Sequence, residues 1–176
     1  AVNRTGGDFR PAPALAFGVP GEDVGSDADA GAAGVVTFDG DTGDVATVGA
    51  LTQDSPGIGG GVEAGDRFGA AVELFQGPGG FSCGVTGVDG FTLVVGAPGE
   101  DLSGDREAGM VHLARDLNSD TPLTQDSAGV DGATEPGDQF GAGLALDSFC
   151  EHDGPSHVRL AVGVPLEDIG SAGDAG

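Results

Sequence analysis

Residues 93–101 read LVVGAPGED, and two other stretches of the chain repeat this phrase closely. Residues 15–23 read LAFGVPGED, and residues 160–168 read LAVGVPLED. Each copy is an apolar run that ends in a Gly-x-Pro corner and continues into an acidic pair. Glycine lets backbones approach closely and proline cannot donate to a sheet ladder, so the corner predicts the end of a buried central strand. The acidic pair is expected where that strand leaves its sheet.

Other phrases recur in the same order along the chain. LTQDS begins at Leu51 and again at Leu123, and GDRFGA at Gly65 returns as GDQFGA at Gly137, with the same offset for both phrases. The prolines of the corners have a similar spacing: Pro20, Pro98 and Pro165. A period of about 70 residues indicates tandem structural units. The chain holds about 2.4 such periods, which divide it into a partial unit 1–64, a unit 65–136 and a partial unit 137–176.

Each unit is predicted to hold four short antiparallel strands, because brief apolar runs alternate with turn residues and no helical stripe is present. The strands expected in the complete unit are 68–75, 91–96, 109–115 and 122–124. The preceding unit repeats the second half of this pattern at 15–18, 34–38 and 46–52. The chain is therefore predicted to be all-β.

The pattern resembles the FG-GAP repeat, which builds the β-propeller head of integrin α-subunits and related bacterial extracellular proteins. Phe-Gly at 68–69 is followed by the Gly-x-Pro corner that ends at Pro98, and Phe-Gly at 140–141 by the corner that ends at Pro165. The resemblance implies that each unit is a propeller blade. Because propellers need four to eight blades, about 2.4 units make an incomplete ring. We expect other blades, in the same longer chain or in another chain, to complete it.

Composition restricts the partners that the chain can bind. The formal net charge is −23, with six arginines and no lysine, so nucleic acid and anionic membrane surfaces are disfavoured. No run of eighteen apolar residues is present, and membrane insertion is not expected. The resemblance implies an extracellular or cell-surface location.

A calcium site is implied by the resemblance, because many blades of that family carry a Ca²⁺ loop between the FG strand and the GAP strand. Hard cations need several oxygens that converge from such a tight loop. The loop DSFCEHDG at 147–154 keeps acids at Asp147, Glu151 and Asp153, which are the predicted ligands. The equivalent loop of the preceding unit keeps only Asp89 with Gly90.

Other acidic clusters have a second interpretation. The alternation Asp116-x-Asn118-x-Asp120 and the cluster 39–44 fall where hairpins should turn, and Asp, Asn and Gly are ordinary turn residues. Turn chemistry is the preferred interpretation for both. The acids after the Gly-x-Pro corners leave two alternatives open, a solvated rim or a surface for cations and cationic partners.

The two cysteines occupy equivalent positions in consecutive units. Cys83 lies fifteen residues before Pro98, and Cys150 lies fifteen before Pro165. Export would favour a Cys83–Cys150 disulfide, although the two loops would have to lean together to bring their Cα atoms within about 7 Å. The histidines match no zinc-ligand spacing and are interpreted as ordinary loop residues, His152 and His157 in particular.

No catalytic motif is present: the sequence has no Gly-x-Ser-x-Gly, His-Glu-x-x-His or P-loop pattern. We therefore predict a non-catalytic extracellular binding or adhesion module that recognises a protein or a glycan through its rim loops. Two alternatives are a propeller that accompanies a secreted hydrolase and a structural repeat protein that self-assembles through its open edges.

Overall fold

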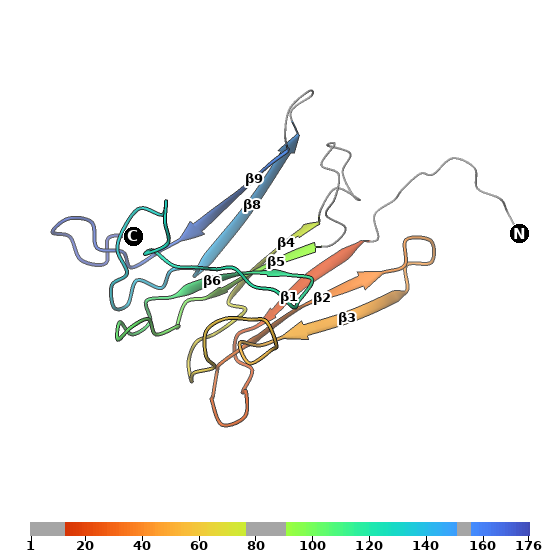
Figure 1. Cartoon of the computed structure of the whole chain (residues 1–176), viewed down its shortest axis with the longest axis horizontal. Helices are drawn as coiled ribbons and strands as arrows, with labels where there is room; N and C mark the ends of the chain where they lie inside the picture. Colours follow the sequence, from red (N-terminus) through yellow and green to blue (C-terminus); the bar gives the residue numbers. More distant parts are fainter. Residues whose placement is uncertain (1–12, 77–90, 151–155) are drawn as a thin grey trace, which may run out of the picture.

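The computed structural model of the chain describes residues 13–76, 91–150 and 156–176, and their regular elements are all β-strands (Figure 1). These strands form three small antiparallel sheets, in the orders β1-β2-β3, β4-β5-β6-β7 and β8-β9. The strands are β1 (Ala14–Val19), β2 (Ala32–Phe38), β3 (Val45–Leu51), β4 (Ala71–Gln76), β5 (Phe91–Ala97), β6 (Met110–Arg115), β7 (Pro122–Leu123), β8 (Gly143–Cys150) and β9 (Ser156–Gly163).

The second sheet confirms the predicted unit of four antiparallel strands. The apolar runs before the Gly-x-Pro corners form β1, β5 and β9, and β5 lies between β4 and β6 as a central strand. One boundary differs from the prediction, because β4 begins at Ala71 and leaves Phe68 in the loop before it. The backbone φ is 55° at Arg67 and 92° at Gly69, and this left-handed conformation cannot continue an extended strand.

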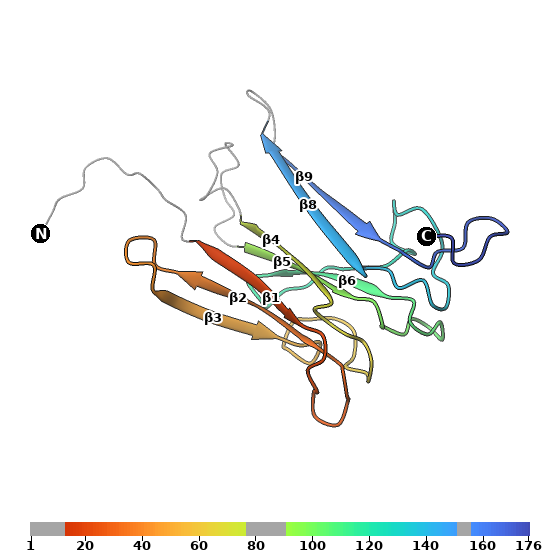
Figure 2. The ribbon, with the colours of Figure 1, turned by 180° about the vertical axis from the view of Figure 1, so that it is seen from behind.

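The three sheets pack face to face, with the second sheet between the other two (Figures 1 and 2). Alternate residues of β5 point to opposite sides. Leu93 and Val95 pack against the first sheet, whereas Val94 packs in a second cluster with residues of the third sheet. The strand β5 is therefore buried on both faces, as the sequence predicts, while β1 and β9 are only partly buried. Within the described residues the first and third sheets each have a neighbouring sheet on one face only.

Glycine is required where consecutive sheets come closest. A Cβ atom on Gly18 would lie 2.0 Å from the carbonyl oxygen of Gly69, and one on Gly96 would lie 2.1 Å from that of Gly141. Both distances are far inside van der Waals contact. The glycines of the first and second corners thus face the glycine of the next Phe-Gly pair, which explains why the two motifs recur together.

The GDxFGA phrase fastens each unit to the one before it. The amide of Phe68 donates to the carbonyl of Ala30 at 2.9 Å, and the amide of Phe140 donates to that of Ala108, also at 2.9 Å. Both phenylalanine side chains are buried. The repeat is therefore a packing device that joins one sheet to the next through the same contact.

The described part of the chain contains three open sheets and no closed ring or barrel. It also contains no helix of the length and apolar character needed to cross a bilayer.

Candidate binding edge and its acidic junctions

The acidic corners all lie at one end of the stacked sheets. The loops 20–31, 98–109 and 165–176 follow β1, β5 and β9, and loops 52–70 and 124–142 lie at the same end (Figure 1). We call these five loops the acidic edge. The sequence predicts that strand exits with acidic pairs share a rim, and the arrangement of the described strands agrees with that prediction.

The three corner loops share one internal hydrogen bond. In each loop a side-chain oxygen of the second acid accepts a hydrogen bond from the backbone amide six residues later, at 2.8–3.1 Å. Each loop also contains an isolated antiparallel β-bridge between two of its own residues, which holds its two sides together. The second acid therefore shapes the loop. The bonded pairs are Asp23 with Asp29, Asp101 with Glu107, and Asp168 with Asp174.

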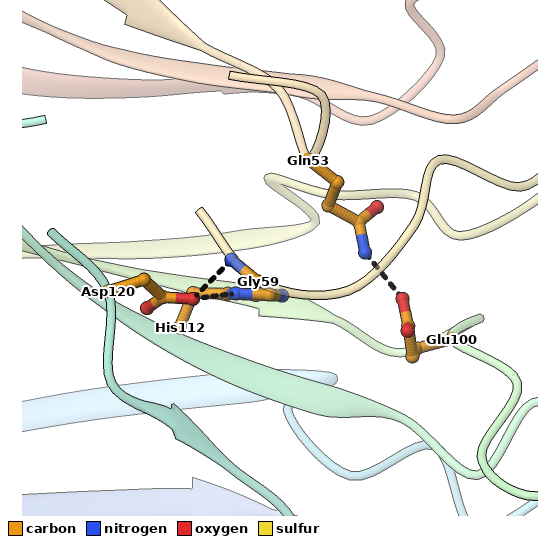
Figure 3. Close-up of polar contacts among 5 residues, drawn as sticks. All are labelled: Gln53, Gly59, Glu100, His112 and Asp120. Atoms are coloured by element: carbon orange, nitrogen blue, oxygen red, sulfur yellow. Dashed lines mark hydrogen bonds and ion pairs between the residues drawn. The ribbon is translucent and has the colours of Figure 1, made fainter. Parts of the chain in front are cut away.

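In the second and third corners, the first acid contacts the preceding unit instead. The amide nitrogen of Gln53 donates to the Glu100 carboxylate (Figure 3), and that of Gln125 donates to Glu167. Both glutamines belong to the repeated LTQDS phrase. This phrase therefore supplies a side-chain hydrogen bond between consecutive units. Within the described residues, the side-chain oxygens of Gln53 and Gln125 are buried and accept no hydrogen bond.

Burial changes the acidity of the carboxyls at the first junction. Desolvation raises the pKa of Glu100 to about 7, although the hydrogen bond from Gln53 opposes the shift. Desolvation also raises the pKa of Asp66 to about 6, against the bond that it accepts from the Glu63 amide at 2.7 Å. Neighbouring acids, including Asp101, raise both values further.

The second junction repeats this set of acids. Desolvation and the charges of Glu167, Asp168 and Asp105 raise the pKa of Asp138, which accepts a bond from the Glu135 amide at 2.8 Å. These residues are the equivalents, one unit later, of those around Asp66. Among the described residues, no group of three or more His, Cys, Asp or Glu side chains is arranged to hold a metal ion.

The solvent side of the edge is strongly negative. The described loops expose eleven acids, whereas their cations are Arg67 and Arg106, and Arg106 lies 3.9 Å from the Asp101 carboxylate. Such a surface repels anions and attracts cationic groups. The exposed acids are Glu22, Asp23, Asp29, Asp54, Glu63, Asp101, Glu107, Asp126, Asp131, Asp168 and Asp174.

A buried histidine–aspartate pair links the second sheet to loop 52–70, and sequence reasoning missed it. The His112 Nδ1 atom lies 2.7 Å from Asp120 Oδ2, which also accepts the Gly59 amide at 3.1 Å (Figure 3). Burial alone would raise the pKa of Asp120, but the bond and charge of His112 hold it below its usual value. The His112 ring meets Phe68 edge-on at 5.1 Å between centroids.

This pair is inside the protein, since both side chains are almost fully buried. The His112 Nε2 atom is buried and has no hydrogen-bond partner among the described residues. The pair acts as a clip that links β6 to loop 52–70. One signal was available in the sequence: His112 interrupts an apolar strand at the position that Gly34 occupies one unit earlier.

The structure describes only some of the residues predicted as metal or disulfide sites. Asp147 is exposed on β8, whereas Glu151 and Asp153 lie outside the described residues. Cys150 is the last residue of β8, and Cys83 lies outside the described residues. The calcium site and the disulfide therefore stay predictions.

Turn chemistry is confirmed for Asp39, whereas Asp116 and Asp120 of the second cluster accept hydrogen bonds from outside their turn. A side-chain oxygen of Asp39 accepts hydrogen bonds from the amides of Asp41 and Thr42 at 2.9 and 2.8 Å. Asp116 accepts the amide of Phe91 at 3.1 Å and so closes the start of β5. Both carboxylates stabilise hairpin ends.

Comparison with models of known protein families gives no match to this chain, and comparison with curated proteins gives none either.

Proposed function

We propose that the chain is part of an FG-GAP-type β-propeller, that its sheets are blades, and that it serves as a non-catalytic extracellular binding or adhesion module. The described residues support the blade interpretation through the four-stranded second sheet and the repeated contact between consecutive sheets. Further blades, in a longer chain or in another chain, would complete the ring.

The observation that carries the binding role is the acidic edge. Three loops of equivalent sequence lie side by side there, and each is fixed by the same aspartate-to-amide bond. A rigid scaffold that presents several ordered loops at one end is the usual arrangement of a recognition surface. Ordered loops also lose little conformational entropy when a ligand binds.

The charge of this edge favours one kind of ligand. A protein with a basic surface segment would be attracted over several ångströms, and its binding would weaken as salt is added. A neutral glycan would be accepted through hydrogen bonds from the loops. We propose that the ligand is a protein or a glycan. The negative charge of the acidic edge favours a protein with a basic surface.

Neutralising exposed edge acids tests the proposal. The variant Glu22→Gln/Asp131→Asn removes two charges from the acidic edge, and Asp41→Asn/Asp44→Asn removes two elsewhere. Both are compared with the wild-type chain on immobilised extracellular matrix proteins and on a glycan array. We expect the edge variant to lose at least tenfold in affinity and the control to bind normally. Equal losses in both variants, or no effect of either, would contradict the proposal.

Calcium is proposed as a stabiliser of the loop that follows Asp147. Oxygen ligands from such a loop would bind Ca²⁺ more weakly once one carboxylate is lost. The melting temperature should fall when EDTA removes calcium, and this difference should shrink in Asp147→Asn. A melting temperature that is the same with calcium and with EDTA would remove calcium from the proposal without affecting the acidic edge.

A further inference from the structure

The Gln53–Glu100 contact at the first junction is a buried pair of one amide and one carboxyl. Gln53 follows β3 and Glu100 follows β5, so the pair joins loop 52–70 to loop 98–109 (Figure 3). Only 3% of Gln53 and 5% of Glu100 is exposed. The backbone of Gly60 lies against both side chains, because a Cβ there would be 3.0 Å from Gln53 Nε2 and 3.2 Å from Glu100 Oε1. The pair is therefore enclosed by the protein.

One polar atom of this pair is left without a partner when Glu100 is ionised. The Gln53 nitrogen donates to the Glu100 carboxylate, whereas the Gln53 Oε1 atom is buried and accepts no hydrogen bond from the described residues. A buried acceptor without a donor is costly. A protonated carboxyl has an O–H to donate, and a glutamine amide carries both a donor and an acceptor. The unpartnered oxygen therefore favours a proton on Glu100.

The charged groups around Glu100 favour the same proton. Asp66 and Glu63 face it from the opposite loop, and Asp101 is beside it in its own loop, where Arg106 lies 3.9 Å from the Asp101 carboxylate. Burial raises the pKa of Glu100 to about 7, and the three neighbouring acids add to the shift, against the hydrogen bond that the carboxylate accepts. An ionised Glu100 is thus a buried charge among like charges.

The second junction holds the same pair in a more open setting. Gln125 donates to Glu167, and the Gln125 Oε1 atom is again buried and accepts no hydrogen bond within the part of the chain that the structure describes. Glu167 itself is partly exposed, unlike Glu100. Because water reaches Glu167, a charge there costs less than a charge on Glu100. The second pair is therefore a matched comparison for the first.

We propose that Gln53 and Glu100 form a proton-controlled latch between loops 52–70 and 98–109. With a proton on Glu100 the pair is neutral, the Gln53 oxygen can accept the O–H, and the two loops stay together. When the proton leaves to solvent, a charge remains in the buried junction, and the loops separate more often so that water reaches it. The latch is strongest at acidic pH and weakens as the pH rises through the folded-state pKa of about 7.

NMR of the free chain as a function of pH tests the latch. The side-chain amide resonances of Gln53 should shift with a midpoint near the Glu100 pKa of about 7 in the wild type, and they should stay constant in Glu100→Gln. The amide of Gly99 reports opening, because it donates from loop 98–109 to the Asp66 carbonyl of loop 52–70 at 3.0 Å.

Hydrogen exchange of Gly99 between pH 5.5 and 8.5, corrected for base catalysis, gives its opening constant. This constant should rise by roughly tenfold or more in the wild type and by less than about twofold in Glu100→Gln. Glu167→Gln is the matched control, since it removes the equivalent acid of the second junction and the same charge from the chain. Gly99 should keep the wild-type pH dependence in this variant.

Three results would overturn the proposal. The first is a set of Gln53 resonances that do not move between pH 5.5 and 8.5. The second is an opening constant of Gly99 that rises equally in the wild type and in Glu100→Gln. The third is an equal flattening by Glu167→Gln, which would show that total negative charge controls the opening. None of these outcomes alters the ligand-binding test on the acidic edge, which changes other residues.

Discussion

Glu100 carries a buried carboxyl at the junction between the first and second sheets, and its charge state couples folding to pH. Burial raises its pKa to about 7, above the value of 4.5 expected in the unfolded chain. The folded protein therefore holds this proton more tightly, and the stabilisation present at low pH is lost as the pH rises from about 4.5 to 7.

Glu100→Gln should flatten this pH dependence, because glutamine keeps a hydrogen-bonding side chain but does not ionise. We expect the variant to be more stable than the wild type at pH 8 by about 1–3 kcal/mol, with little difference at pH 5. Urea unfolding at both pH values measures it. Asp54→Asn, which removes an exposed charge, is the control for the overall negative charge. A variant with an unchanged pH profile would show that Glu100 is not protonated in the folded state.

Asp120 is the second buried acid with a specific partner, and its loss should destabilise the protein. Asp120→Asn weakens the charge-assisted bond to His112, so the free energy of unfolding should fall by about 1–3 kcal/mol. Asp116→Asn changes an exposed acid in the same hairpin, and it should cost less than about 0.5 kcal/mol because the asparagine oxygen can still accept the Phe91 amide. Thermal unfolding monitored by circular dichroism compares the two. Equal losses would contradict the clip between His112, Asp120 and Gly59.

At the scale of elements, the corner glycines control how closely the sheets approach. Gly96→Ala would place a Cβ 2.1 Å from the Gly141 carbonyl, so the second and third sheets would have to move apart. We expect a loss of about 1–3 kcal/mol. Gly163 holds the same position one unit later, but its Cβ would meet nothing closer than 3.5 Å, so Gly163→Ala should cost less than about 1 kcal/mol. Denaturant midpoints decide between these values, and a tolerated Gly96→Ala would contradict the close approach.

The strands were predictable from local pattern, while the junctions between them were not. Short apolar runs bounded by glycine and proline predict β5 and β6 because strand signals are local. Phe68 was expected inside a strand, yet the left-handed backbone at Arg67 and Gly69 turns it into an anchor between sheets. Pattern alone cannot show that conformation, since arginine rarely adopts it.

At the scale of the whole chain, the constant offset between the repeated phrases predicts tandem units, and the described sheets agree with it. The roles of individual acids were not predictable, because identical residue types serve different purposes within one corner. Asp101 shapes its own loop, whereas Glu100 bonds to Gln53 from 47 residues away. The His112–Asp120 pair was missed for the same reason, since Gly59 joins it from a different unit.

The central claim is that each unit is fastened to the one before it by its GDxFGA phrase, which brings the loops together as a single acidic edge. Hydrogen exchange of backbone amides, followed by NMR, tests this claim most directly. The amides of Phe68 and Phe140 donate across the two junctions, so both should exchange far more slowly than the amide of Gly61, in an exposed part of loop 52–70. Exchange of Phe68 and Phe140 at the rate of Gly61 would contradict the stacked arrangement and the single edge that it builds.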